Sequence, residues 1–435
     1  MTQPALMLSS NHRNSAQPKL YYGWVIVAVC FIILTLVFGV RLSFAVFFVA
    51  LIDEFGWSRA DTALIFSISM MVFAATSTLA GIALDRWGAR RTFGIGAAFL
   101  AVGLLLSSQI QTLWQLALIY GGVAGLGITI LGLGPLASLI ARWFHRRRGL
   151  AIGIAFAGTG VGSLLIIPGV EYLIGGSGWR AAYIVLAVLA LATIPIILRF
   201  LRMNPEDLQL LPDGGSSPSS SEQHDGFLEN WKMNQVIRTA AFWFLLLSAL
   251  GAIGPIRMLT VHQLAIIVDA GFTRSFAAAL VGTAGVITAI AFIVFGGLSD
   301  RVDRRLVYIF GSFSLILAML ILNRLQNNPP DINLVVIYTI LFGIGEGSRA
   351  SLVTAVASDL FPGDAMGGIN GTVGAAFGVG AAIFPWLAGR LFDIHGNYTI
   401  VLGVAGIAVI ISTISLSLAP LFKRVPHKHL PRSAN

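Results

Sequence analysis

GIALDRWGARR at residues 81–91 and GGLSDRVDRR at residues 296–305 are the two stretches that decide the fold. They lie 215 residues apart, and the same spacing brings GWSR at residues 56–59 onto GFTR at residues 271–274. Later in the chain, a spacing of 218 residues relates glycine and tyrosine positions in the same way. Chance similarity between apolar segments would not keep charged residues in register, so the chain is built from two repeated halves.

The composition is that of a membrane protein. Of the 435 residues, 56% are hydrophobic and 11% are charged, and the mean hydropathy is +0.84. A soluble domain carries about a quarter charged residues, so this composition excludes an ordinary soluble enzyme, and the abundant apolar residues exclude a disordered chain. Twelve apolar runs are long enough to cross a bilayer. They lie at residues 22–51, 60–84, 92–110, 113–141, 149–175, 179–200, 240–268, 275–298, 305–323, 333–357, 366–390 and 398–421.

The repeat and the twelve runs predict an all-α membrane protein with twelve transmembrane helices in two pseudo-symmetric six-helix bundles. A long polar stretch that contains PDGGSSPSSS at residues 212–221 is typical of a flexible linker between them. Parallel six-helix repeats indicate a secondary transporter whose site lies between the halves, near the bilayer midplane. We therefore expect a tail at residues 1–20, a bundle at 21–201, a linker at 202–237, a second bundle at 238–421 and a tail at 422–435.

Lysine and arginine residues are distributed unevenly between the two sides of the membrane. If the N-terminus is inside, 20 of the 28 lie on the inner side and 5 on the outer side. This bias predicts that both termini lie in the cytoplasm. We expect the protein to lie in the cell inner membrane and to be a monomer. The bias accounts for the net charge of +9 and the pI of about 10.1 without nucleic acid, and it places basic loops beside lipid head groups.

The repeated loop after the second helix of each half resembles the signature loop of the major facilitator superfamily. In that family the loop's Asp and Arg pair across helix ends and latch the outward-open state, as a contact made in one state and broken in the other. The second copy has Asp303 where the first has Gly88. The alternative is that these charges only enforce topology. The resemblance implies a gating role for Gly81, Asp85, Arg86, Gly88, Arg90, Asp300, Arg301 and Arg305.

The start of the fifth helix narrows this resemblance. WFHRRRGLAIGIAFAG at residues 143–158 joins an aromatic pair to a basic cluster and spaced small residues. It resembles the helix-five signature of monocarboxylate transporters and their bacterial relatives, including oxalate/formate-type antiporters. Thr288 and Phe292 stand where helix eight of that family carries an Asp and a substrate-binding Arg, and Leu42, beside Arg41, stands at the family's lysine. The resemblance implies the fold, while the family's substrate and proton machinery is not carried over.

Four charged residues lie within helices, away from the helix ends: Arg41, Arg257, Glu346 and Arg349. A charge inside the membrane costs about 2.5–3.5 kcal/mol on insertion scales, so each should face a cavity or a partner. Arg41 and Arg257 occupy nearly equivalent positions in the two halves, and a guanidinium group matches a carboxylate. We predict an anionic small-molecule substrate bound by Arg41, Arg257, Arg349 and, in the eleventh helix, Asn370.

Two side chains are candidates for carrying a coupling proton. Glu346 is acidic and lies near the middle of the tenth helix, and His262 carries an imidazole, which ordinarily titrates near pH 6.5. Each has an alternative. Glu346 and Arg349 are three residues apart and can form a local ion pair, and His262 can be a hydrogen-bonded core histidine.

The sequence carries no signature of catalysis. It has no Walker loop, no His/Cys cluster with metal spacing and one cysteine, Cys30. We therefore expect no enzyme activity, cofactor, metal or internal disulfide. The prediction is a secondary active transporter in the lipid bilayer that moves a small, monocarboxylate-like anion by alternating access, with proton-coupled uptake. The alternatives are an importer of another solute such as a vitamin, a proton-antiport exporter of drugs, metabolites or siderophores, and a receptor that has lost transport.

Overall fold

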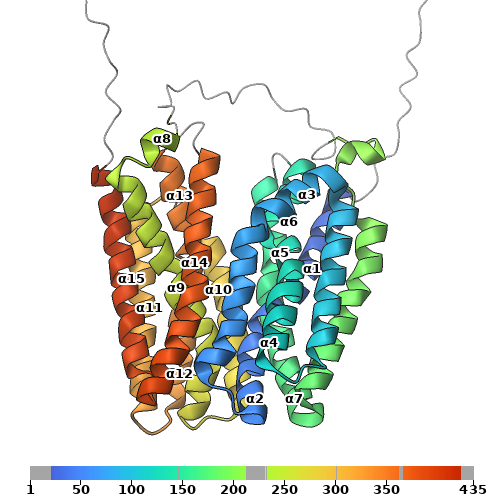
Figure 1. Ribbon diagram of the computed structural model, residues 1–435. Helices are drawn as coiled ribbons and strands as arrows, with labels where there is room; N and C mark the ends of the chain where they lie inside the picture. Colours follow the sequence, from blue (N-terminus) through green and yellow to red (C-terminus); the bar gives the residue numbers. More distant parts are fainter. Residues whose placement is uncertain are drawn as a thin grey trace, which may run out of the picture.

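The two predicted bundles lie side by side in the structure, a computed structural model (Figure 1). The start of α1 and the end of α15 lie at the same end of the molecule. Of the expected site residues, Asp300 and the side chain of Asn370 lie outside the described part of the chain. The structure describes residues 21–144, 147–211, 231, 233–299, 301–361 and 366–422.

Every regular element in the described ranges is helical. The first bundle comprises α1 (Gly23–Leu42), α2 (Phe44–Phe55), α3 (Arg59–Ser107), α4 (Leu113–Leu116), η1 (Ala117–Ala124), α5 (Gly125–Ile130), α6 (Leu133–Trp143) and α7 (Arg148–Phe200). A short helix, η2 (Pro205–Leu208), follows it. The second bundle comprises α8 (Met233–Val236), α9 (Ala240–Asp269), α10 (Arg274–Leu298), α11 (Arg304–Gln326), α12 (Ile332–Gly347), α13 (Ala350–Leu360), α14 (Met366–His395), α15 (Thr399–Leu418) and η4 (Ala419–Phe422).

Two of the helices cross the membrane twice. Ten helical spans in the described residues are long and apolar enough to cross a bilayer, and α3 and α7 hold 49 and 53 residues. A straight helix of 50 residues is about 75 Å long, more than twice the thickness of the hydrocarbon core. Each is broken at a glycine of positive φ, Gly88 (76°) and Gly178 (82°). The spans therefore agree with the predicted twelve-helix fold.

Three other crossing helices are interrupted near their middle, which the sequence analysis did not predict. The first bends at Ser43 between α1 and α2, where the backbone angles stay helical, the fourth breaks at Gly132 between α5 and α6, and the tenth at Ser348 between α12 and α13. Ser43 and Ser348 lie within two residues of Arg41 and Glu346. In transporters, interrupted helices bring helix ends and backbone polar groups to the depth at which substrates bind.

The bundles meet through closely packed small residues. A Cβ atom added to Gly282 in α10 would lie 2.9 Å from the carbonyl oxygen of Ser163 in α7. One added to Gly389, near the end of α14, would lie 2.5 Å from the backbone of residues 59 and 60. Glycines toward the end of the molecule that carries the termini instead have open space where a Cβ would be: Gly81, Gly149, Gly296 and Gly371. The closest packing therefore lies between mid-membrane and the opposite end.

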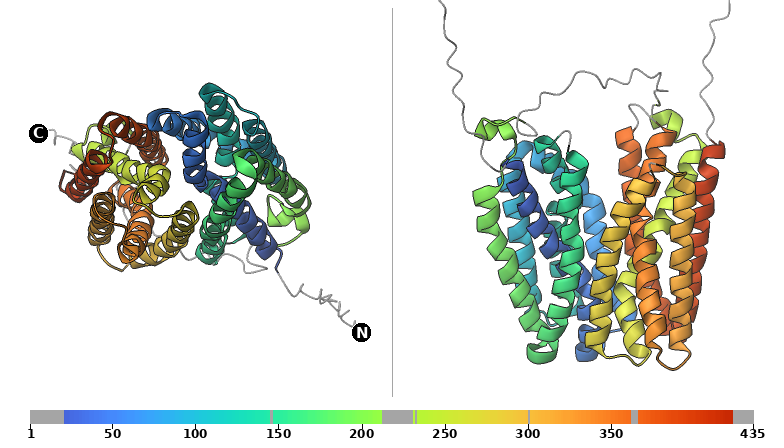
Figure 2. Two further views of the ribbon diagram at one scale, coloured as in Figure 1. Left: turned by 90° about the horizontal axis from the view of Figure 1, so that it is seen from below. Right: turned by 180° about the vertical axis from the view of Figure 1, so that it is seen from behind.

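Charged side chains join the two bundles at the end opposite the termini, toward which the bundles converge (Figures 1 and 2). Arg59 at the start of α3 pairs with Asp269 at the end of α9, at 2.7 Å. Arg274 at the start of α10 pairs with Asp53 in α2. The carboxylate of Asp393 accepts hydrogen bonds from the backbone N–H groups of the first two residues of α3, at 3.0 and 2.9 Å. The structure is therefore closed at this end.

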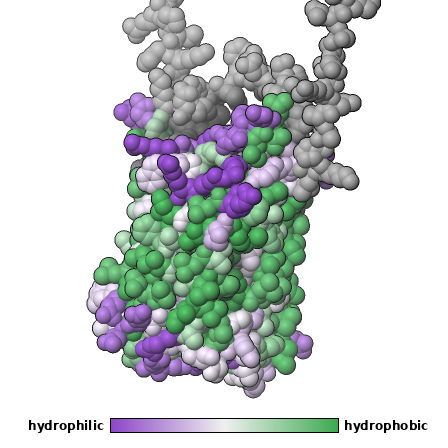
Figure 3. All heavy atoms as spheres, turned by 90° about the vertical axis from the view of Figure 1, so that its right-hand side faces the viewer, coloured by the Kyte–Doolittle hydropathy of each residue, from purple (hydrophilic) through white to green (hydrophobic). Residues whose placement is uncertain are grey.

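The outer surface has the pattern that a bilayer requires. Figure 3 shows a band of hydrophobic residues around the middle, with hydrophilic residues gathered above and below it. Large apolar side chains such as Val102, Val188 and Phe313 are 48%, 57% and 64% exposed. In water such a surface would be unfavourable, whereas lipid chains solvate it.

Candidate functional site

The charged centre of the site is an ion pair between two helices of the second bundle. Arg257 in α9 and Glu346 in α12 approach to 3.1 Å between Nη2 and Oε1, and both side chains are 16% exposed. The other carboxylate oxygen of Glu346 accepts a hydrogen bond from Thr288 in α10 at 3.3 Å. The resemblance to monocarboxylate transporters implied that such proteins carry an acid at the position of Thr288. In this chain Thr288 instead donates a hydrogen bond to Glu346, an acid on a neighbouring helix.

Arg349 lies apart from this pair, so it does not form the local ion pair with Glu346 that was the alternative to a proton-carrying Glu346. Its guanidinium is fully buried and donates to Ser312 at 2.5 Å, to Tyr308 at 2.8 Å and to Ser412 at 3.0 Å. It also reaches the carbonyl groups of residues 251 and 252 at 3.3 and 3.4 Å. Because all its nitrogens are engaged by neutral groups, Arg349 joins four helices of the second bundle. This geometry gives no support to the expectation that it binds substrate.

Arg41 has almost no polar partner. Its Nη2 lies 2.9 Å from the sulfur of Met70, and its Nε is buried without a hydrogen bond. The guanidinium carbon lies 5.5 Å from the centre of the Phe73 ring and 5.9 Å from that of Phe38. No carboxylate within the described ranges forms an ion pair with it, although the Arg257–Glu346 pair is close enough to act on it electrostatically. A cation that is partly buried and lacks a counter-ion is costly and marks a site where an anion would be stabilised.

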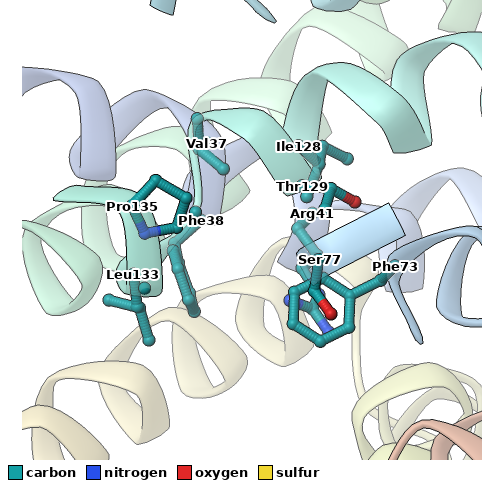
Figure 4. Close-up of a pocket in the computed structure, with 11 residues that line it drawn as sticks. Val37, Phe38, Arg41, Phe73, Ser77, Ile128, Thr129, Leu133 and Pro135 are labelled. Carbon is teal, nitrogen blue, oxygen red and sulfur yellow. The ribbon is translucent and has the colours of Figure 1, made fainter. Parts of the chain in front are cut away.

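A cavity of about 140 Å³ adjoins Arg41 (Figure 4). The interruption of the fourth helix at residues 132–135 forms one wall, and α1 and α3 form the others. Ser77 and Thr129 are the polar side chains of the lining besides Arg41, and the rest of the wall is apolar. The cavity therefore presents one cationic group, two hydroxyl groups and an apolar surface.

Tyr120 is a further polar group near Arg41 that the sequence analysis did not assign to the site. It lies on η1, a π-helical turn of a kind frequent at functional sites, and its buried hydroxyl has no hydrogen-bond partner. Its counterpart in the repeat, Tyr338, donates to Gln263 at 2.6 Å. The repeat relates the two tyrosines in the sequence, and the structure shows that only Tyr338 has a partner for its hydroxyl.

His262 has the surroundings of the core histidine that was its alternative. The ring is fully buried, with Nε2 2.9 Å from the carbonyl oxygen of Pro385 and Nδ1 2.9 Å from the hydroxyl of Tyr398. A carbonyl only accepts, so Nε2 carries the proton and Nδ1 accepts from Tyr398. Tyr398 in turn accepts from Arg59 at 2.7 Å. His262 is thus tied to the closed end of the molecule rather than to the Arg257–Glu346 pair.

The two repeated loops make their described ion pairs within their own halves. Asp85 pairs with Arg142 at 2.7 Å, and the N–H of Arg305 and then its guanidinium hold the pKa of Asp303 below its ordinary value. Arg90 donates through Nε to the carbonyl of Leu201 at 2.9 Å. Among the described residues, no ion pair across the halves involves Arg86 or Arg301. The other two gating candidates in these loops, Gly81 and Gly88, have no side chain that could form one. The gating role stays a prediction that concerns the opposite state of the cycle.

Comparison with known proteins agrees with this architecture. Residues 28–267 and 258–435 match the family model of the Major Facilitator Superfamily. The chain is 27% identical to human monocarboxylate transporter 12, covering 95% of this chain and 83% of that protein, and 30% identical to human monocarboxylate transporter 11, covering 87% and 79%. Its fold is similar to that of a D-xylose-proton symporter, with a TM-score of 0.67, 14% identity and 93% and 99% of the two chains covered.

The family match spans both bundles, and the matched relatives extend over nearly the whole chain. The duplicated loops at residues 81–91 and 296–305 and the helix-five segment at 143–158 lie within the ranges matched by the family model. The chain belongs to the major facilitator superfamily and, within it, to the monocarboxylate transporter branch, so it is a multi-pass membrane transporter and not an enzyme.

Proposed function

We propose that the protein is a proton-coupled carrier of a small monocarboxylate anion, which works by alternating access as a monomer in the cell inner membrane with both termini cytoplasmic. The observation that carries this proposal is Arg41, a partly buried guanidinium whose Nε is buried without a hydrogen bond, with no carboxylate partner in the described residues, beside a cavity. A carboxylate would supply the missing counter-ion and accept from the guanidinium. The names of the relatives, monocarboxylate transporters, support the same substrate class.

The cavity beside Arg41 sets the kind of anion. Its volume of about 140 Å³ is close to that of a cavity that accommodates benzene, about 150 Å³. Its walls offer one cationic group, so the second carboxylate of a dicarboxylate would be left unpaired in an apolar surrounding, at a high desolvation cost. The cavity therefore favours an anion with one carboxylate and a compact apolar body.

The ion pair between Arg257 and Glu346 supplies the coupling. A proton on Glu346 would neutralise the carboxylate and leave Arg257 without a counter-ion, which raises the affinity of the site for an anion. Arg41, Arg257 and Glu346 together carry one net positive charge, and binding a proton with a monoanion leaves that charge unchanged. Crossing the membrane with an unchanged site charge avoids the cost of moving an extra charge through lipid.

The test is transport by the purified, full-length protein in liposomes that contain a pH-sensitive dye. We expect proton entry on addition of small aliphatic or aromatic monocarboxylates, and none with dicarboxylates, neutral solutes or cations. Arg41→Gln should abolish both uptake and proton entry. Glu346→Gln should abolish proton entry while retaining exchange of labelled substrate.

The matched control is Arg324→Gln, the same substitution at an exposed residue at the end of α11. It should leave transport unchanged. Full uptake of a monocarboxylate by Arg41→Gln would contradict the anion site. Proton entry driven by a neutral or cationic solute would contradict the substrate class and favour a vitamin importer or an exporter.

A further inference from the structure

An open pocket lies at the edge of the first bundle, at the end that carries the termini, and the proposed transport function does not use it. Its volume is about 570 Å³. It lies where the second half of α3 begins, beside the end of α7 and the short helix η2. The lining residues that decide its chemistry are Trp87, Arg90, Arg91, Leu198, Arg202 and Asp207.

The charge of this pocket is strongly positive. Three guanidinium groups face one carboxylate, and no ion pair joins that carboxylate to any of them in the described part of the chain. Asp207 instead accepts a hydrogen bond from the backbone N–H of Asn204, the N-cap residue of η2, as the acidic member of its capping box. The arginines are positioned by backbone carbonyls, because Arg90 donates to Leu201 and Arg202 donates to residues 199 and 201.

An apolar surface continues from the pocket toward the middle of the membrane. A Cβ atom added to Gly94 of α3 would lie 3.5 Å from the side chain of Leu198 of α7, so the two helices run close together below the pocket. Trp87 is 51% exposed, as is typical of the amphipathic rings that lie at the membrane interface. Further apolar side chains are exposed along the same two helices: Ile95, Phe99, Val102, Val188, Leu191 and Leu198.

We propose that this pocket binds the phosphate head group of an anionic phospholipid, whose acyl chains lie along the exposed apolar surface of α3 and α7. Guanidinium groups bind phosphate through paired hydrogen bonds. Basic pockets between transmembrane helices on the cytoplasmic side bind such head groups. The continuous apolar surface selects a membrane lipid over a soluble phosphate, which would use only the charged part of the site.

The test is native mass spectrometry of the full-length protein in detergent, titrated with phosphatidylglycerol or with phosphatidylcholine of the same acyl chains. Phosphatidylglycerol should bind more tightly, by on the order of fivefold for each arginine that contacts the phosphate. The double variant Arg91→Gln/Arg202→Gln should bring the affinity for phosphatidylglycerol down to that for phosphatidylcholine. Arg324→Gln, the matched control, should not change it.

A second variant should gain affinity, which a folding defect would not mimic. Asp207→Asn removes the one negative charge of the pocket and keeps an oxygen that can cap η2, so the affinity for phosphatidylglycerol should rise several-fold. Equal affinity for the two lipids, or an Asp207→Asn variant that binds phosphatidylglycerol no better than the unmodified protein, would overturn the proposal. Displacement of the lipid by millimolar inorganic phosphate would also overturn it, in favour of a soluble-phosphate site.

Discussion

At the scale of single residues, two arginines inside the helices of the same chain have opposite surroundings. Arg349 is held by hydroxyl and carbonyl groups of three other helices, α9, α11 and α15, and lies over the ring of Tyr308 at 4.5 Å. Arg41 is held by a thioether and two phenyl rings and has a buried nitrogen without a partner. The first arrangement stabilises a bundle, whereas the second leaves a cation available to a ligand.

This contrast gives a prediction about stability. Arg349→Met should lower the free energy of unfolding by on the order of 3 kcal/mol, because several buried hydroxyl and carbonyl groups lose their donor. Arg41→Met should leave thermal stability unchanged or raise it, because it removes a partly buried and poorly satisfied cation, and it should abolish uptake. Thermal unfolding in detergent and liposome uptake would be measured on both. A stable, inactive Arg349→Met variant would show that Arg349 acts on transport directly.

The two repeat-related tyrosines give a matched pair of variants. Tyr120→Phe removes a buried hydroxyl without a partner, so stability should hold while KM for the substrate rises several-fold if this hydroxyl donates to the bound anion. Tyr338→Phe removes the donor to Gln263 and should cost about 1–3 kcal/mol of stability. The measurements are the midpoint of thermal unfolding and KM for uptake. An unchanged KM in Tyr120→Phe would remove this tyrosine from the site.

The sequence identifies the charged members of the site but not their partners. Arg41, Arg257 and Glu346 are recognisable because charges inside apolar runs are costly. That Glu346 pairs with Arg257, 89 positions earlier in the chain, rather than with Arg349 depends on how α9 and α12 are rotated against each other. The engagement of Arg349 likewise depends on hydroxyl groups from distant helices, which no local pattern reveals.

At the scale of elements, the apolar runs predicted where helices lie but not where they break. Gly88 and Gly178 separate adjacent crossings and lie between predicted runs, with backbone angles that favour glycine. The interruptions at Ser43, Gly132 and Ser348 lie inside uniform apolar runs. Hydropathy does not mark them, because glycine, proline and serine can stand in an apolar run without ending it, and they are the interruptions that coincide with the candidate site.

The break in α7 can be tested with two neighbouring glycines. Gly178→Ala places a Cβ on a residue with φ of 82° and should destabilise the protein by about 1–3 kcal/mol. Gly175→Ala lies three residues earlier in ordinary helical conformation with open space around the added Cβ, so it should be neutral or slightly stabilising. The midpoints of thermal unfolding of the two variants would be compared. Equal midpoints would contradict a strained backbone at Gly178.

At the scale of the whole molecule, the internal repeat predicted two bundles but not which end of their interface is closed. The same sequence must adopt both states of a transport cycle. Neither its hydropathy nor its repeat therefore indicates which end of the interface is closed. The structure is closed at Arg59, Gly389 and Asp393. The division of the chain at residues 202–237 stays a prediction, because most of that linker lies outside the described residues.

A larger side chain at the closed end should shift the protein toward the state in which this end is open. A side chain at Gly389 would collide with the backbone of residues 59 and 60, so Gly389→Leu should hold this end open. In a Cys30→Ser background, a cysteine introduced at Arg41 should then react faster with a membrane-impermeant thiol reagent added from that side. Gly403→Leu, at a glycine with open space in α15, is the control. Equal labelling rates would show that Gly389 does not govern closure.

The contact between Asp393 and the first turn of α3 has a consequence for how this family can diverge. Asp393 binds main-chain N–H groups, which every residue except proline possesses. Mutation can therefore replace the side chains at positions 59 and 60 without removing these two hydrogen bonds. Only Asp393 and the small residue at position 389 must be kept for this contact to form. Residues of the two bundles therefore need not change together, and correlated substitutions in an alignment of relatives will not reveal the contact.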